Sequence, residues 1–84
     1  MTREQINDFV EAAGFESTLV AEGLDDAFIG ITDDGVAVYS KNRCVRSIME
    51  ADGISEEEAI EFLEFNTYSC YVGEMTPLFI TTVD

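Results

Sequence analysis

The sequence contains no histidine. This absence excludes Ser-His-Asp and Cys-His catalysis, histidine metal sites and the commonest general base of enzymes. Walker loops, Rossmann glycine motifs and EF-hand spacing are also missing. The adjacent carboxylates Asp25-Asp26 and Asp33-Asp34 are candidates for a shared divalent cation, but such pairs in turns usually serve the turn itself. We therefore expect no enzyme, no metal site and no cofactor.

Basic residues are scarce as well. Only 4 Lys and Arg stand against 18 Asp and Glu, which gives a formal net charge of −14. Direct binding to nucleic acid or to an anionic membrane is disfavoured, because such binding needs a broad basic surface that displaces counterions. The charge instead favours cationic partners.

Cysteines and long apolar runs are few. Cys44 and Cys70 are the only cysteines, and they form neither a C-x-x-C pair nor a dense framework. No leader with a basic start and an apolar middle precedes them, so we expect a reduced, cytoplasmic protein with two buried thiols; a bridge between them is the alternative. No apolar run approaches the ~20 residues of a membrane span, which predicts a soluble chain.

What the sequence does contain is enough apolar material for one folded domain spanning residues 1–84. Hydrophobic residues make up 46% of the chain, and six Phe and three Tyr supply bulk for a small core. Thr2 and Gln5 have the spacing of a capping box before a first helix. Two β-rich runs, residues 27–32 and 36–40, flank an Asp-Gly turn and predict a β-hairpin.

The second half of the chain predicts two further helices and a last strand. Residues 41–52 have an amphipathic helical pattern that a glycine ends. Ser55 and Glu58 form a second capping box, so a third helix begins at Glu56, while its end is left open. After Pro77 an apolar run predicts a strand. The order α-β-β-α-α-β indicates an α+β domain in which helices pack on one face of a short antiparallel sheet.

The third helix carries the densest charge. At about 100° per residue, Glu57, Glu61 and Glu64 fall within roughly 60° of each other on the side opposite the core, spread over about 10 Å. We call these three residues the acidic ridge. Glu57 and Glu61 are four positions apart and repel each other, so the ridge costs some stability, which suggests a use. The alternative is a solvated face that keeps a phenylalanine-rich chain soluble.

Phe65 lies next to the acidic ridge rather than over the core by the same angular count. An apolar side chain ringed by carboxylates suits a binding interface. The alternative is a phenylalanine covered by a neighbouring loop. Glu56, Asp33 and Asp34 are candidates to extend the partner-binding surface.

The basic residues are clustered in sequence. Lys41, Arg43 and Arg46, which we call the basic corner, lie within six positions at the start of the second helix. With the free N–H groups of that helix start, they could hold a phosphate or a carboxylate. Tyr68 and Tyr71 would complete such a ligand pocket. The alternative is internal pairing with nearby aspartates.

Several short motifs follow one another in the second half of the chain. They are DG, EEA, EFN and YVGE-TP-F, within Asp52 to Ile80, and the upstream run VAEGLDDAFIGI, from Val20 to Ile31, adds to them. Together they resemble a family of small acidic proteins of tailed bacteriophages and prophages. The chain departs from that pattern at TYSC, Thr67 to Cys70, which bears on the end of the third helix. The resemblance implies an origin, and the cytoplasm of an infected bacterium as the location, but no mechanism.

Small acidic phage proteins commonly bind a host protein. We therefore expect a module that inhibits a basic, nucleic-acid-binding host protein by presenting an acidic surface. Carboxylates ~5 Å apart along a helix roughly reproduce the charge density of a nucleic-acid strand. The alternative is a non-enzymatic accessory protein that self-assembles or binds a small anionic ligand at the basic corner. The sequence fixes neither the host target nor the oligomeric state.

Overall fold

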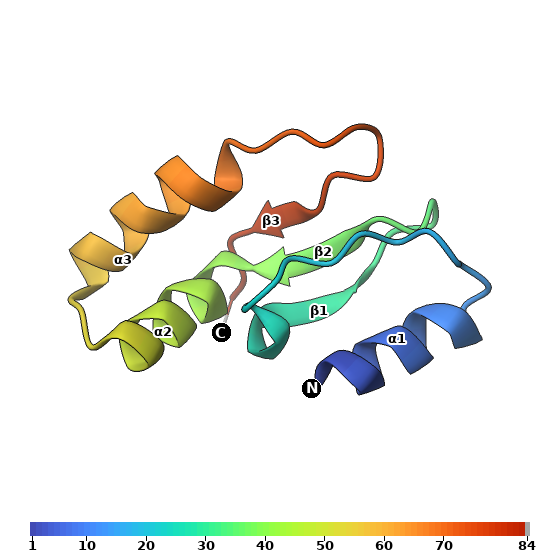
Figure 1. The fold of residues 1–84 in the computed structure, drawn as a ribbon, viewed down its shortest axis with the longest axis horizontal. Coiled ribbons are helices and arrows are strands. Elements are labelled where there is room, and N and C mark those ends of the chain that lie inside the picture. The colour runs from blue at the N-terminus through green and yellow to red at the C-terminus, as the bar shows by residue number, and fades with distance from the viewer. Residues whose placement is uncertain (84) are drawn as a thin grey trace.

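The computed structural model describes residues 1–83. Its elements follow in the order α1 (Arg3–Ala12), η1 (Asp25–Ala27), β1 (Phe28–Ile31), β2 (Ala37–Ser40), α2 (Lys41–Asp52), α3 (Glu56–Leu63), η2 (Glu64–Tyr68) and β3 (Leu78–Ile80). This is a single α+β domain with the predicted order of helices and strands (Figure 1). Among the described residues, no helix combines the length and the apolar character that crossing a membrane requires.

Local hydrogen bonds start two of the helices where the sequence predicts. The Thr2 hydroxyl accepts from the Gln5 backbone N–H at 3.2 Å, and the Gln5 side chain accepts from the Thr2 N–H at 2.9 Å. Ser55 and Glu58 form the same reciprocal pair at the start of α3. Each box satisfies backbone donors that the first helical turn leaves without partners.

The sheet is mixed rather than antiparallel throughout. β1 pairs antiparallel with β2, with a bulge between Phe28 and Gly30, as the predicted hairpin requires. β3 pairs parallel with β2, so the expected antiparallel direction is wrong for this strand. The reason lies in the connection. β2 passes directly into α2, α3 returns alongside α2, and residues 69–77 carry the chain back to the end where β2 begins (Figure 1).

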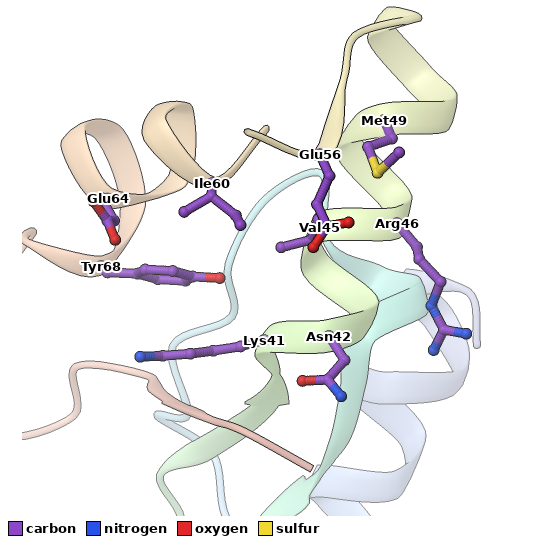
Figure 2. Close-up of a pocket in the computed structure, with 9 residues that line it drawn as sticks. All are labelled: Lys41, Asn42, Val45, Arg46, Met49, Glu56, Ile60, Glu64 and Tyr68. Carbon is purple, nitrogen blue, oxygen red and sulfur yellow. The ribbon is translucent and has the colours of Figure 1, made fainter. Parts of the chain in front are cut away.

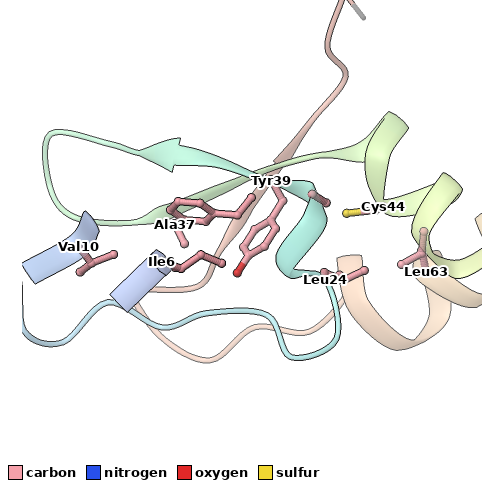
Figure 3. Close-up of a cluster of buried hydrophobic side chains, with 9 residues drawn as sticks. Ile6, Val10, Leu24, Ala37, Tyr39, Cys44 and Leu63 are labelled. Atoms are coloured by element: carbon pink, nitrogen blue, oxygen red, sulfur yellow. The ribbon is translucent and has the colours of Figure 1, made fainter. Parts of the chain in front are cut away.

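Three aromatic rings cross the sheet on its core face. Tyr39 stacks on Phe79 with ring centroids 5.4 Å apart and meets Phe28 edge-on at 5.7 Å. Ile6 and Val10 of α1 pack against this layer (Figure 3). Aromatic pairs at these distances add to the stability gained from burying their area.

The two faces of the sheet differ in what covers them. α1 contributes side chains to the core face, whereas α2 and α3 extend beyond the end of β2 as a helical pair (Figure 1). On the other face, Leu78 and Ile80 are exposed and Val38 is half-buried. The helices therefore leave that face of the described chain open.

The end of the third helix is a π-helical turn. α3 passes into η2 without a break, and the helical backbone ends at Ser69. Because a π-turn takes up an extra residue, Tyr68 comes round to the core side and Cys70 follows after the helix has ended. Cys44 is buried as predicted, but Cys70 is exposed and neither thiol is bridged. The expectation of two buried thiols is therefore wrong for Cys70.

Candidate functional site: an acidic helix face beside a groove

All three glutamates of the acidic ridge are exposed as predicted: Glu57 and Glu61 on α3, and Glu64 at the start of η2. Among residues 1–83, the ion pair within 4.0 Å is Arg3–Asp25, at 3.2 Å. Glu57 and Glu61 therefore face solvent without a basic partner in the described chain. Neither carboxylate is needed for the cap, because Glu58 closes the capping box.

Phe65 lies one helical turn after Glu61, and 82% of its side chain is exposed. The alternative that a neighbouring loop covers this ring is wrong, because the chain turns away after Ser69 and leaves the ring in solvent. Phe62, on the same helix, is 43% exposed and was not predicted as a surface residue. The helical count does not give this exposure, because Phe62 is three positions after the buried Ala59 and therefore flanks the core side of the helix.

The other acidic candidates lie at different places. Glu64 and Glu56 are exposed and also border a groove (Figure 2). Asp33 and Asp34 are exposed at the tip of the hairpin, at the opposite end of a molecule whose longest dimension is 38 Å (Figure 1). The structure thus keeps the acidic ridge and Phe65 on one continuous helical segment and separates them from Asp33 and Asp34.

The groove runs between α2 and α3 and has a volume of about 720 Å³. Its apolar lining comes from Val45, Met49, Ile60 and the ring of Tyr68 (Figure 2). Charged side chains border it with opposite signs: Lys41 and Arg46 come from α2, Glu56 comes from α3 and Glu64 from η2. Sequence reasoning missed this groove: Glu56, Ile60 and Glu64 recur every four residues, but the π-turn of η2 sets the position of Tyr68.

Lys41 and Tyr68 close one end of the groove. The Lys41 ammonium lies 5.0 Å from the centroid of the Tyr68 ring, a cation–π contact (Figure 2). The hydroxyl of Tyr68 is buried and has no hydrogen-bond partner of ordinary geometry in the described chain. The thiol of Cys44 is close enough to interact with this hydroxyl. The negative charge of the Glu64 carboxylate also acts on it.

Burial determines the protonation states of Cys44 and Tyr68 at this end of the groove. Desolvation raises the pKa of Cys44 to about 11, and the nearby Tyr68 hydroxyl lowers it only partly. Desolvation is also the largest cause that raises the pKa of Tyr68 to about 12, followed by the Cys44 thiol and the Glu64 charge. Both groups are therefore neutral near pH 7, and Cys44 is not a thiolate nucleophile.

The basic corner does not converge on one ligand site. Lys41 points to Tyr68, whereas the Arg46 side chain points the other way (Figure 2). Arg46 borders the groove as well, but with Arg43 it also lines a second hollow that two carboxylates line, Asp26 and Glu50. A small anion would compete there with carboxylates of the protein itself, which argues against the predicted phosphate or carboxylate site.

Tyr71 also departs from the predicted pocket. Its side chain is 79% exposed. With Lys41 and Tyr68 it lines another hollow, of about 480 Å³, between β3 and the loop that precedes it. Of the five predicted ligand-binding residues, these three share a hollow that Arg43 and Arg46 do not line. Among the described residues, no group of three or more His, Cys, Asp or Glu side chains is arranged to hold a metal ion.

No protein-family model matches this sequence, and neither the curated proteins nor the solved structures include a significant match.

Proposed function

We propose that this chain is a non-enzymatic protein-binding module that inhibits a basic, nucleic-acid-binding protein by occupying its nucleic-acid site. The observation that carries the proposal is the solvent face of α3. There Glu57 and Glu61 lie without a basic partner in the described chain, beside a phenylalanine ring that is 82% exposed.

The charge of the chain explains why such a surface would find a nucleic-acid site. With a net charge of −14, long-range attraction would steer the chain towards a positively charged cleft. Carboxylates one helical turn apart can contact the lysines and arginines that otherwise contact phosphates. Binding of this kind competes with nucleic acid and weakens as salt rises.

Phe65 would supply binding free energy that the charged residues alone do not provide. Surface ion pairs each contribute little net free energy, because the charges lose hydration when they meet. An aromatic side chain that enters a pocket on the partner is the typical source of binding energy in an interface. The glutamates would therefore set orientation and association rate, and Phe65 would slow dissociation.

The resemblance to small acidic phage proteins supports the biological setting of this proposal. In that setting the location is the cytoplasm of an infected bacterium, and the targets are nucleases, restriction enzymes, CRISPR effectors or polymerases. The alternative of a small anionic ligand at the basic corner receives less support, because Arg43 and Arg46 line a hollow with carboxylates.

The test is affinity capture from a lysate of the bacterial host with three tagged proteins. They are the wild type, the ridge variant Glu57→Lys/Glu61→Lys and a control, Glu4→Lys/Glu11→Lys. All four glutamates are exposed on helices, so both variants change the charge equally. Bound proteins are eluted in turn by duplex DNA and by raised salt.

We expect the wild type and the control to retain a nucleic-acid-binding protein that duplex DNA displaces, and the ridge variant to lose it. With the purified partner, Phe65→Ala should weaken binding by about 30-fold or more, as for a central interface residue. If both charge variants lose the bound protein equally, net charge and not the position of Glu57 and Glu61 explains the binding, which contradicts the proposed surface. A partner that DNA does not displace would contradict the proposal.

A further inference from the structure

One part of the chain is almost free of charge. Of 22 charged residues, 18 acidic and 4 basic, only Glu74 lies between Phe65 and Val83. The loop of residues 69–77 and β3 belong to this stretch and form one edge of the molecule, the upper edge in Figure 1. A stretch with a single charged residue is unusual in a chain whose net charge is −14.

The same edge exposes apolar side chains. The exposed fractions are 79% for Tyr71, 61% for Val72, 47% for Leu78 and 44% for Ile80. We call these four residues the uncharged edge. The hollow of about 480 Å³ that Tyr71 and Leu78 line lies within it and offers room for an apolar side chain.

β3 is also an edge strand without the usual protection. The strand order is β1-β2-β3, so among the described residues no strand pairs with the outer side of β3. Proteins commonly guard such edges with charged side chains, proline or a bulge. β1 has a bulge and follows Asp25 and Asp26, whereas β3 has neither, and Pro77 precedes its paired residues.

We propose that the uncharged edge is the contact surface between two copies of this chain. Two molecules that each carry −14 repel one another where their carboxylates meet. At the uncharged edge they meet only two charged side chains, Glu74 and Lys41, which line its hollow and have opposite signs. A basic partner finds Glu74 as the one carboxylate of that stretch, whereas a second copy brings an equally apolar surface in the two-fold arrangement that most dimers adopt. This inference goes beyond the proposed function and leaves the solvent face of α3 free for its partner.

The dimer has a salt dependence opposite to that of the acidic face. Salt screens the repulsion between two acidic copies and strengthens an apolar contact. Dimerisation should therefore tighten as NaCl is raised, while binding to a basic partner should weaken. The two measurements can fail separately, so each proposal is tested on its own.

Sedimentation velocity over a range of protein and NaCl concentrations provides the test. The variant Val72→Glu/Leu78→Glu places charges on the uncharged edge. The control Leu19→Glu/Ile29→Glu adds the same charge at apolar residues outside it, which are 41% and 39% exposed. We expect a wild-type dimer that tightens with salt, a control that also dimerises in high salt, and a dissociation constant raised at least about 100-fold in the edge variant, because unpaired charges would be buried.

A second measurement needs no substitution. Cys70 is exposed within the uncharged stretch and Cys44 is buried, so a nitroxide label attaches selectively to Cys70 of the native protein. We expect dipolar coupling between labels on two copies, growing with salt and protein concentration. A wild type that stays monomeric in high salt, an equal effect of both double variants, or larger aggregates in place of a dimer would overturn the proposal.

Discussion

At the scale of single residues, three tyrosines occupy three different environments. Tyr39 is fully buried, and its hydroxyl accepts a hydrogen bond from the Ala21 backbone N–H at 2.7 Å. The hydroxyl of Tyr68 is buried without such a bond, and Tyr71 is exposed. The free energy of a buried hydroxyl depends on whether it finds a partner, so the same substitution should act differently at each site.

We predict opposite effects for two Tyr→Phe substitutions. Tyr39→Phe should lower the free energy of unfolding by about 1–2 kcal/mol, because the Ala21 N–H loses its acceptor. Tyr68→Phe should leave it unchanged or raise it by up to about 1 kcal/mol, because the desolvated hydroxyl that is removed has only the weakly hydrogen-bonding Cys44 thiol beside it. Urea unfolding followed by circular dichroism measures both, with Tyr71→Phe as the control. Destabilisation by Tyr68→Phe as large as that by Tyr39→Phe would contradict this interpretation.

The buried hydroxyl and thiol also predict a loss of stability at alkaline pH. Burial raises the pKa of Cys44 from 9.0 to about 11 and that of Tyr68 from 10.0 to about 12. The folded state therefore holds these protons more tightly than the unfolded state, so their contribution is complete below pH 9 and is lost as pH rises through 11 and 12.

Urea unfolding between pH 8 and pH 12 checks this expectation. We expect the free energy of unfolding to fall across this interval, and to fall less in Tyr68→Phe, which lacks one of the titrating groups. Burial also raises the pKa of Tyr39, so part of the fall in the free energy of unfolding should persist in Tyr68→Phe. The same decline in the wild type and in Tyr68→Phe would show that Tyr68 does not contribute.

At the scale of elements, the caps and turns follow from a few neighbouring residues. Gly53 ends α2 with a φ of 64°, and Gly35 ends the hairpin turn with a φ of 84°. Both positions favour glycine for its freedom at positive φ. They differ in what surrounds them: a Cβ at Gly53 would meet open space, whereas a Cβ at Gly35 would overlap the ring of Phe15.

We therefore predict unequal costs for two Gly→Ala substitutions. Gly53→Ala should cost about 1 kcal/mol for the left-handed backbone alone. Gly35→Ala should cost at least about 2 kcal/mol, because displacement of the Phe15 ring adds to the same strain. Equilibrium unfolding of the two variants gives the comparison. Equal costs would mean that the segment after α1 moves aside without penalty.

At the scale of the whole molecule, charge is the dominant feature. The net charge of −14 is distributed over a chain whose described residues contain a single ion pair within 4.0 Å. Self-repulsion on this scale opposes compaction and is reduced when salt screens it. The free energy gained by burying the core must therefore exceed the electrostatic repulsion, whose size depends on the salt concentration.

Salt should accordingly stabilise the monomer. Between low and moderate NaCl we expect the free energy of unfolding to rise by about 1 kcal/mol, or Tm by about 4–8 °C, measured at protein concentrations too low for dimerisation. Glu57→Lys/Glu61→Lys changes the net charge by +4, from −14 to −10, and should show a smaller response. An equal salt response in both proteins would rule out self-repulsion as its cause.

The sequence by itself determined the local structure and the overall charge. The starts of α1 and α3, the hairpin and the extent of α2 matched the prediction, because capping boxes, turn glycines and apolar spacing act over a few residues. Net charge is a sum over residues and needs no structure. The exposure of Glu57 and Glu61 followed from the same helical count.

Only the tertiary structure decided how distant segments meet. The direction of β3 depends on the end of the sheet to which residues 69–77 return the chain. The exposure of Cys70 depends on a π-turn that no short sequence motif predicts. The separation of Arg43 from Lys41 likewise depends on how α2 packs against its neighbours. These outcomes rest on contacts between residues far apart in sequence, which local propensity does not encode.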